Sequence, residues 1–142
     1  MAKIEWDDSL SVGVDLIDEQ HKMLIKRISD LHEAVSTSMA AGGIAQTLDF
    51  LVDYTDFHFS TEEKHMEKHE YPGMADHLKA HKEFKTTLGN LTEDFQEEGA
   101  TQQLADSVDT FLFKWLVKHI KQVDQELGRF IAEKGIEMVE ET

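Results

Sequence analysis

Hydrophobic residues recur at steps of three and four along four long segments of the chain. These segments run over residues 17–35, 44–62, 74–95 and 104–123, and in the last of them the stripe passes through Leu112, Trp115 and His119. Steps of this size keep one face of a helix turned inward, and the period-two alternation typical of strands is nearly absent. Each segment is therefore predicted to form an amphipathic helix.

Short breaks separate the four segments. Ala41-Gly42-Gly43 is predicted to end the first helix, Tyr71-Pro72-Gly73 separates the second from the third, and Gly99 ends the third. Long helices joined by short connections pack beside their sequence neighbours. We therefore expect an all-α fold in which residues 1–142 form one up-down-up-down antiparallel four-helix bundle.

Two further segments flank the expected bundle. Residues 1–16 form an N-terminal arm that carries apolar side chains ahead of the first helix. After Gly128, apolar residues predict a short C-terminal helical tail. These residues are Phe130, Ile131, Ile136 and Val139.

Composition narrows the classes of partner and of site. The net charge of -15, with 29 acidic against 14 basic residues, argues against nucleic acid or an anionic membrane as partner. The absence of cysteine excludes disulfides, thiolate sites and iron–sulfur clusters. The N-terminus MAKIEWDDS lacks the apolar run of a signal peptide, and no stretch approaches the ~20 apolar residues of a membrane span. A cytoplasmic protein is the expectation.

Histidines interrupt the apolar faces of all four predicted helices. Those in phase with the stripes are His21, His58, His77, His81 and His119, and Glu62 shares the phase of His58. Reflecting these positions through the turns of an antiparallel bundle places them in one layer, within ~5–10 Å of one another along the axis. A single such histidine is more often a hydrogen-bonded core residue. Five at one level would be costly to bury unpaired, so they predict a metal site.

Periodicity leaves two ligand choices open. His58 and His65 both share the phase of Glu62, and the layer estimate does not separate them. His65 lies toward the end of its helix, by the turn, so we expect it to be partly exposed. Asp124 follows His119 by five residues, which is about 140° around a regular helix. A distorted turn would let both side chains reach inward.

The donor set indicates which metal the site would hold. The pairs His58–Glu62 and His77–His81 have the i, i+4 spacing that directs two side chains to one point. With five histidines and two carboxylates there are too many donors for a tetrahedral zinc site, and they suit a binuclear centre. Nitrogen and carboxylate donors without thiolate favour iron over manganese or copper.

Four stretches of the chain resemble the motifs of the hemerythrin family, and in particular its single-domain bacterial members. They are VGVDLIDEQHKML at 12–24, HFSTEE at 58–63, HLKAH at 77–81 and WLVKHIKQVD at 115–124. Each stretch is modest alone, but the four occur in the family's order and spacing, and the resemblance runs over nearly the whole chain.

The resemblance implies a role for each donor. It assigns His58 rather than His65 as the ligand on the second helix, and it makes Glu62 and Asp124, with an oxo or hydroxo group, the bridges between two iron ions. The coordinatively filled iron would be held by His77, His81 and His119. The other iron would be held by His21 and His58 and would keep an open position for O2.

The resemblance also implies an oxygen pocket and a function. The pocket residues would be Phe59, Phe84, Trp115 and Leu116, which would be core residues in any bundle. The implied function is reversible O2 binding without enzymatic activity, for storage, sensing or delivery to an oxygen-requiring enzyme. The alternative is a di-iron enzyme or redox protein that acts as a peroxidase, a nitric-oxide reductase or an iron donor. A monomer is slightly favoured.

Overall fold

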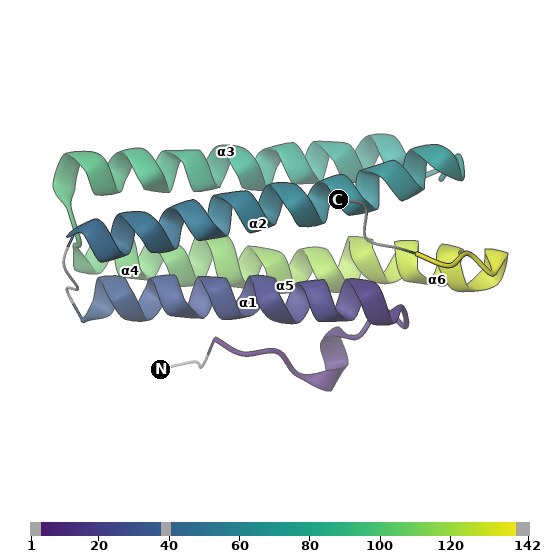
Figure 1. The fold of residues 1–142 in the computed structure, drawn as a ribbon, viewed down its shortest axis with the longest axis horizontal. Helices are drawn as coiled ribbons and strands as arrows, with labels where there is room; N and C mark the ends of the chain where they lie inside the picture. Colours follow the sequence, from purple (N-terminus) through teal and green to yellow (C-terminus); the bar gives the residue numbers. More distant parts are fainter. Residues whose placement is uncertain (1–3, 38–40, 139–142) are drawn as a thin grey trace.

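The computed structural model of this chain describes residues 4–37 and 41–138, and no strand occurs among them. The first three long helices are α1 (Asp15–Ser36), α2 (Ala41–Lys68) and α3 (Met74–Glu98). Each lies antiparallel to its sequence neighbour, and the fourth helix packs between α3 and α1 (Figure 1). The predicted four-helix bundle is confirmed.

The fourth helix is continuous but is not regular. Its α-helical parts are α4 (Gln102–Ser107), α5 (Trp115–His119) and α6 (Gln125–Lys134). Two π-helical segments, η2 (Val108–Lys114) and η3 (Ile120–Asp124), join them. Figure 1 shows the whole run as one rod along the bundle.

One line of buried residues along this helix recurs every four positions. A regular α-helix turns about 400° in four residues, so five such steps would drift about 200° around the axis. The wider π turns, with their i→i+5 hydrogen bonds, offset that drift. Leu116 rather than Trp115 is therefore the fully buried residue, and the stripe predicted through Trp115 was displaced by one position. The buried residues at these steps are Leu104, Val108, Leu112, Leu116, Ile120 and Asp124.

The helix ends agree with the sequence at one break and differ at another. Gly99 ends α3 with a φ of 75°, a left-handed conformation that glycine adopts without strain. The side chain of Thr101 then accepts a hydrogen bond from the N–H of Leu104 and caps α4. Ala41-Gly42-Gly43 was predicted to end the first helix, but α1 ends at Ser36 and α2 begins at Ala41. The glycine pair lies within the first turn of α2, where helical hydrogen bonds have already begun.

The N-terminal arm is fixed to the end of the fourth helix. It contains a short 3-10 turn, η1 (Asp8–Leu10), and buries the side chains of Leu10 and Val12. The side-chain amide of Gln125 donates to the carbonyls of Ser9 and Ser11. The arm approaches so closely that a Cβ on Gly128 would lie 2.1 Å from the carbonyl oxygen of Val12.

The C-terminal helical tail starts earlier than Gly128. α6 runs through that residue without a break to Lys134, and Gly135 ends it with a φ of 63°. Phe130 and Ile131 belong to α6, Ile136 follows the end of the helix, and Val139 lies outside the described residues. The tail is therefore the end of the fourth helix.

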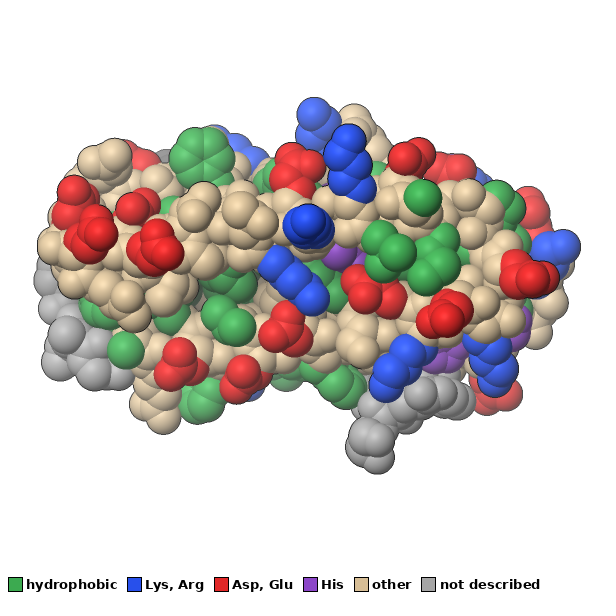
Figure 2. Space-filling view, turned by 90° about the horizontal axis from the view of Figure 1, so that it is seen from above, with side chains coloured by type: hydrophobic (Ala, Val, Ile, Leu, Met, Phe, Trp, Pro, Cys, Tyr) green, Lys and Arg blue, Asp and Glu red, His purple; other side chains and the backbone are tan. Residues whose placement is uncertain are grey.

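Acidic residues outnumber basic ones, 29 to 14. Figure 2 shows acidic side chains spread over one face of the molecule, with histidine visible only in small patches between helices. Within residues 4–37 and 41–138, no helix combines the length and the apolar character required to cross a bilayer.

Candidate metal centre

The seven side chains predicted from the sequence meet in one buried cluster inside the bundle. Each has at most 4 % of its surface exposed. They come from α1 (His21), α2 (His58 and Glu62), α3 (His77 and His81), α5 (His119) and η3 (Asp124). The layer that the sequence predicted is therefore present, with every long helix contributing to it.

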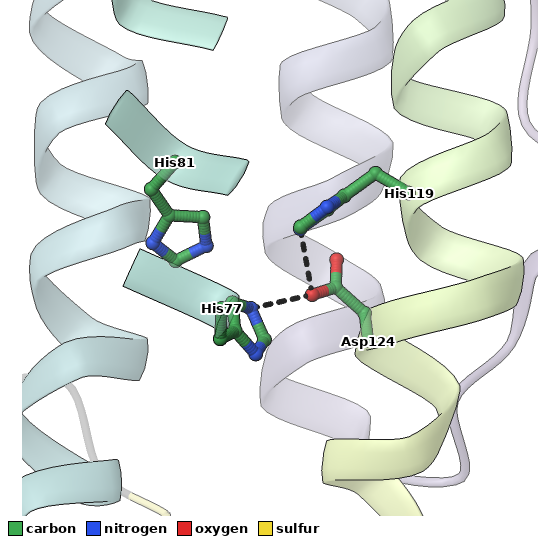
Figure 3. Close-up of side chains that lie close together, drawn as sticks. All are labelled: His77, His81, His119 and Asp124. Carbon is green, nitrogen blue, oxygen red and sulfur yellow. Dashed lines mark ion pairs between the residues drawn. The ribbon is translucent and has the colours of Figure 1, made fainter. Parts of the chain in front are cut away.

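Four of these side chains form one group that could hold a metal ion. The ligand atoms of His77, His81, His119 and Asp124 all lie within 4.8 Å of one another. Figure 3 shows their arrangement, in which Asp124 points between two imidazoles. Its Oδ1 lies 2.9 Å from Nε2 of His77 and 3.1 Å from Nε2 of His119.

A second group lies beside the first and shares Asp124 with it. It consists of His21, His58, Glu62 and Asp124. Oδ2 of Asp124 lies 3.0 Å from Nε2 of His21, so the two oxygens of one carboxylate face different groups. Glu62 behaves similarly, because Oε2 lies 3.4 Å from His58 while Oε1 lies 3.1 Å from His81. Both carboxylates therefore span the two groups.

The π turn explains how Asp124 joins His119. The segment η3 lies between them and replaces one α-helical turn. Its i→i+5 pattern places residues five apart on the same side of the helix. The distorted turn that the sequence required is thus η3.

The polar atoms of the cluster satisfy one another poorly without a cation. His58 donates its Nδ1–H to Oε1 of Gln20, so Nε2 of the neutral ring is an acceptor that faces the carboxylate of Glu62. Among the described residues, buried atoms on all seven side chains have no hydrogen-bond partner, including Nε2 of His21 and both oxygens of Asp124. Burial of such atoms is costly. A cation between each imidazole and carboxylate removes this cost, so the residues fit a metal pair.

Burial and the close pairing of imidazoles with carboxylates shift the pKa values of the cluster residues. Burial lowers the pKa of His58 to about 4, which keeps its ring neutral. Burial also lowers the pKa of His77, but the adjacent carboxylates of Asp124 and Glu62 outweigh it and raise the value to about 10. Burial raises the pKa of Asp124, yet the neighbouring histidines, His119 first, hold it well below its usual range. Without a metal, protons on histidines such as His77 therefore carry the positive charge that a metal would otherwise supply.

His65 lies outside the cluster. It is buried rather than partly exposed as its position near the turn indicated, and its Nδ1–H donates to the backbone carbonyl of Thr61. Of the two histidines that periodicity left open on α2, His58 is the one beside Glu62 and His21.

Aromatic rings cover the cluster. Phe59 stacks on His81 with a centroid distance of 3.8 Å, and Trp115 stacks on His119 at 4.8 Å. Phe84 contacts both Phe59 and Trp115, and Leu116 is fully buried nearby on α5. Three of the four residues expected to form an oxygen pocket, Phe59, Phe84 and Trp115, thus form one apolar wall, with Phe59 and Trp115 against the histidines of the His77 group. Leu116 is the buried residue that follows Trp115 in the chain.

Sequence reasoning missed two residues that support the cluster from outside. Gln20 and Glu63 accept hydrogen bonds from His58 and His81. Each stands directly beside a donor in the sequence, which is a signal that could have identified them.

The family described as hemerythrin HHE cation binding domain matches residues 12–131. The chain belongs to the hemerythrin family. It is 38% identical to a bacteriohemerythrin of Stenotrophomonas maltophilia over 88% of this chain and 79% of that protein. It is 32% identical to a myohemerythrin of Theromyzon tessulatum over 84% of this chain and 87% of the relative.

Solved hemerythrin structures agree with this assignment. A wild-type hemerythrin crystal structure superposes with a TM-score of 0.79 at 30% identity, and the match covers 90% of this chain and 97% of that one. The resemblance to hemerythrins that four short motifs indicated is therefore confirmed over most of the chain.

Proposed function

We propose that the protein binds O2 reversibly at a pair of iron ions held by the seven buried donors. The observation that carries the proposal is the pair of donor groups that share Asp124, with unsatisfied nitrogen and oxygen atoms directed into both. Membership of the hemerythrin family supports it. The relatives named above are hemerythrins, and none of those names belongs to the enzyme alternative.

The donors have distinct roles in the proposal. His77, His81 and His119 would hold one ion, His21 and His58 would hold the other, and Glu62 and Asp124 would contribute carboxylate oxygens to both. A ferrous pair, when bound, supplies the redox chemistry of reversible O2 binding. The chain itself fixes the imidazoles, balances the positive charge with two carboxylates and excludes bulk water.

The apolar wall protects the site. Phe59, Phe84 and Leu116 are fully buried, and Trp115 covers His119. Such a wall admits a small apolar molecule and restrains water, which limits irreversible oxidation. For the physiological role we propose O2 storage, sensing or delivery to an oxygen-requiring enzyme. A monomer suffices because all seven donors come from one chain.

An anaerobic loading experiment tests the proposal. The metal-free protein is loaded with Fe²⁺ under nitrogen, assayed for iron, exposed to O2 and then returned to nitrogen while its optical spectrum is recorded. Two irons per chain, with charge-transfer bands that appear with O2 and vanish on its removal, are expected. Iron that oxidises at once and does not recover would favour the enzyme or redox alternative.

Matched histidine variants test the donor set. His77→Ala should lose iron, because its imidazole contacts both carboxylates. His65→Ala is the control on α2, since its Nδ1 is bound to the Thr61 carbonyl outside the cluster. Retention of two irons and normal O2 binding in His77→Ala would contradict the assignment.

A further inference from the structure

Two of the cluster's imidazoles are supported from outside by a hydrogen-bond acceptor. Nδ1–H of His58 donates to Oε1 of Gln20 at 2.8 Å, and Nδ1–H of His81 donates to Oε2 of Glu63 at 2.8 Å. By contrast, the Nδ1 atoms of His21 and His77 are buried and have no hydrogen-bond partner within residues 4–37 and 41–138. The support is therefore selective, with one supported ring in each donor group.

Helix geometry explains how both supports arise. Gln20 directly precedes His21 on α1, and Glu63 directly follows Glu62 on α2. Adjacent residues on a helix differ by about 100° around its axis. One of each pair therefore points into the cluster, while the other reaches a ligand on the next helix. Gln20 links α1 to α2, and Glu63 links α2 to α3.

The two acceptors differ in charge. Gln20 is a neutral amide, 1% exposed, behind the ring of His58. Glu63 is a carboxylate whose side chain is 29% exposed, behind the ring of His81. An acceptor on the far nitrogen makes a ligating imidazole a stronger donor to its metal, and an anionic acceptor does so more strongly than a neutral one.

We propose that Gln20 and Glu63 are positioning residues that make the two metal positions electronically unequal. Glu63 increases the electron density at the metal position held by His77, His81 and His119. Gln20 fixes the ring of His58 without adding charge. This inference rests on the iron pair of the proposed function. Its consequence is that the first electron removed from the ferrous pair comes from the His81 side.

Exchange of the two acceptors tests the proposal with nearly isosteric substitutions. Glu63→Gln removes the negative charge and keeps the acceptor, and Gln20→Glu adds a charge on the opposite side. Glu97→Gln, an exposed carboxylate near the far end of α3, controls for the change in net charge. Each protein is loaded with ⁵⁷Fe²⁺ under nitrogen, and its iron content and Mössbauer spectrum are recorded.

The first oxidation step gives the second measurement. Ferricyanide takes one electron from the ferrous pair and becomes ferrocyanide, so a titration with redox mediators gives the midpoint potential. Glu63→Gln should raise that potential and Gln20→Glu should lower it, while Glu97→Gln leaves it unchanged. In the ferrous spectrum, Glu63→Gln should alter the signal of one iron and Gln20→Glu that of the other.

Opposite shifts distinguish positioning from structural damage, because a loosened bundle would move both variants in the same direction. If Gln20→Glu fails to fold, Gln20→Met takes its place. It removes the acceptor and should weaken iron binding about 10–100-fold. Both variants should then raise the potential, so the Mössbauer spectrum distinguishes them: Gln20→Met should alter the signal of one iron and Glu63→Gln that of the other, whereas a loosened bundle would alter both signals in each variant.

Two irons with unmoved potentials and unchanged Mössbauer signals in the variants would overturn this inference and leave the proposed function intact. A wild-type protein that holds no iron pair would overturn both.

Discussion

Oδ1 of Asp124 lies 3.1 Å from Nε2 of His119, although the two residues are five positions apart along the fourth helix. A regular α-helix would turn the second side chain about 140° away from the first. The π turn η3 closes that angle. π turns within α-helices are frequent at functional sites, and this one is where the helix supplies the carboxylate that both donor groups share.

Loss of the shared carboxylate should affect both metal positions. Asp124→Asn keeps the size of the side chain but removes the charge that balances His21 and His77. We expect the loss of most bound iron, whereas His58→Ala should lower occupancy mainly at one position. Iron assays and Mössbauer spectra of the two anaerobically loaded variants measure this. Full occupancy in Asp124→Asn would mean that Asp124 does not bridge the pair.

The metal-free protein should be most stable near pH 6.5. His77 has a pKa raised to about 10, so its contribution to stability is present below pH 6.5 and is lost as pH rises toward 10. His58 has a pKa lowered to about 4, so its contribution is present above pH 6.5 and is lost as pH falls toward 4.

Iron should change this pH profile. It takes the place of the proton on His77, so the decline above pH 6.5 should weaken in the loaded protein. Denaturant unfolding of both forms from pH 5 to 9.5 checks the profile. A metal-free protein whose stability rises steadily to pH 9.5 would contradict the role of His77.

Two glycine-to-alanine changes should have opposite effects on stability. Gly128→Ala places a Cβ 2.1 Å from the backbone carbonyl of Val12, so the arm must move, and the expected loss is about 1–3 kcal/mol. Gly89→Ala, in the exposed middle of α3, meets no atom within 4 Å and should gain about 0.5–1 kcal/mol. Chemical denaturation measures both values. Equal effects would show that the arm does not pack on α6 as described.

Leu116→Ala should separate protection of the site from stability of the bundle. The residue is fully buried and directly follows Trp115 on α5, so its truncation should cost about 2–5 kcal/mol. It should also speed oxidation of the iron-loaded protein in air, because water gains access. Leu91→Ala removes the same side chain far along α3 and should cost stability without changing oxidation. Equal oxidation rates in the two variants would remove Leu116 from the protective wall.

The sequence was sufficient for the features that depend on local periodicity. Steps of three and four residues placed the inner faces of α1, α2 and α3, because a helix has one fixed period. They also placed histidine in phase with leucine, so the cluster could be expected from the cost of burying unpaired rings. The predicted end of the first helix was wrong because glycine is a weak helix former, and the glycine pair that was taken to end α1 lies in the first turn of α2.

Only the tertiary structure decided the rest, because those features depend on contacts between helices. The π turns give Leu116 the buried position that periodicity had assigned to Trp115, and they bring Asp124 beside His119. Packing between helices places His58 rather than His65 in the cluster and sets Gln20 and Glu63 behind two of its rings. The spacing of residues fixes which face of a helix is buried, but a partner on another helix can be found only once the helices are packed.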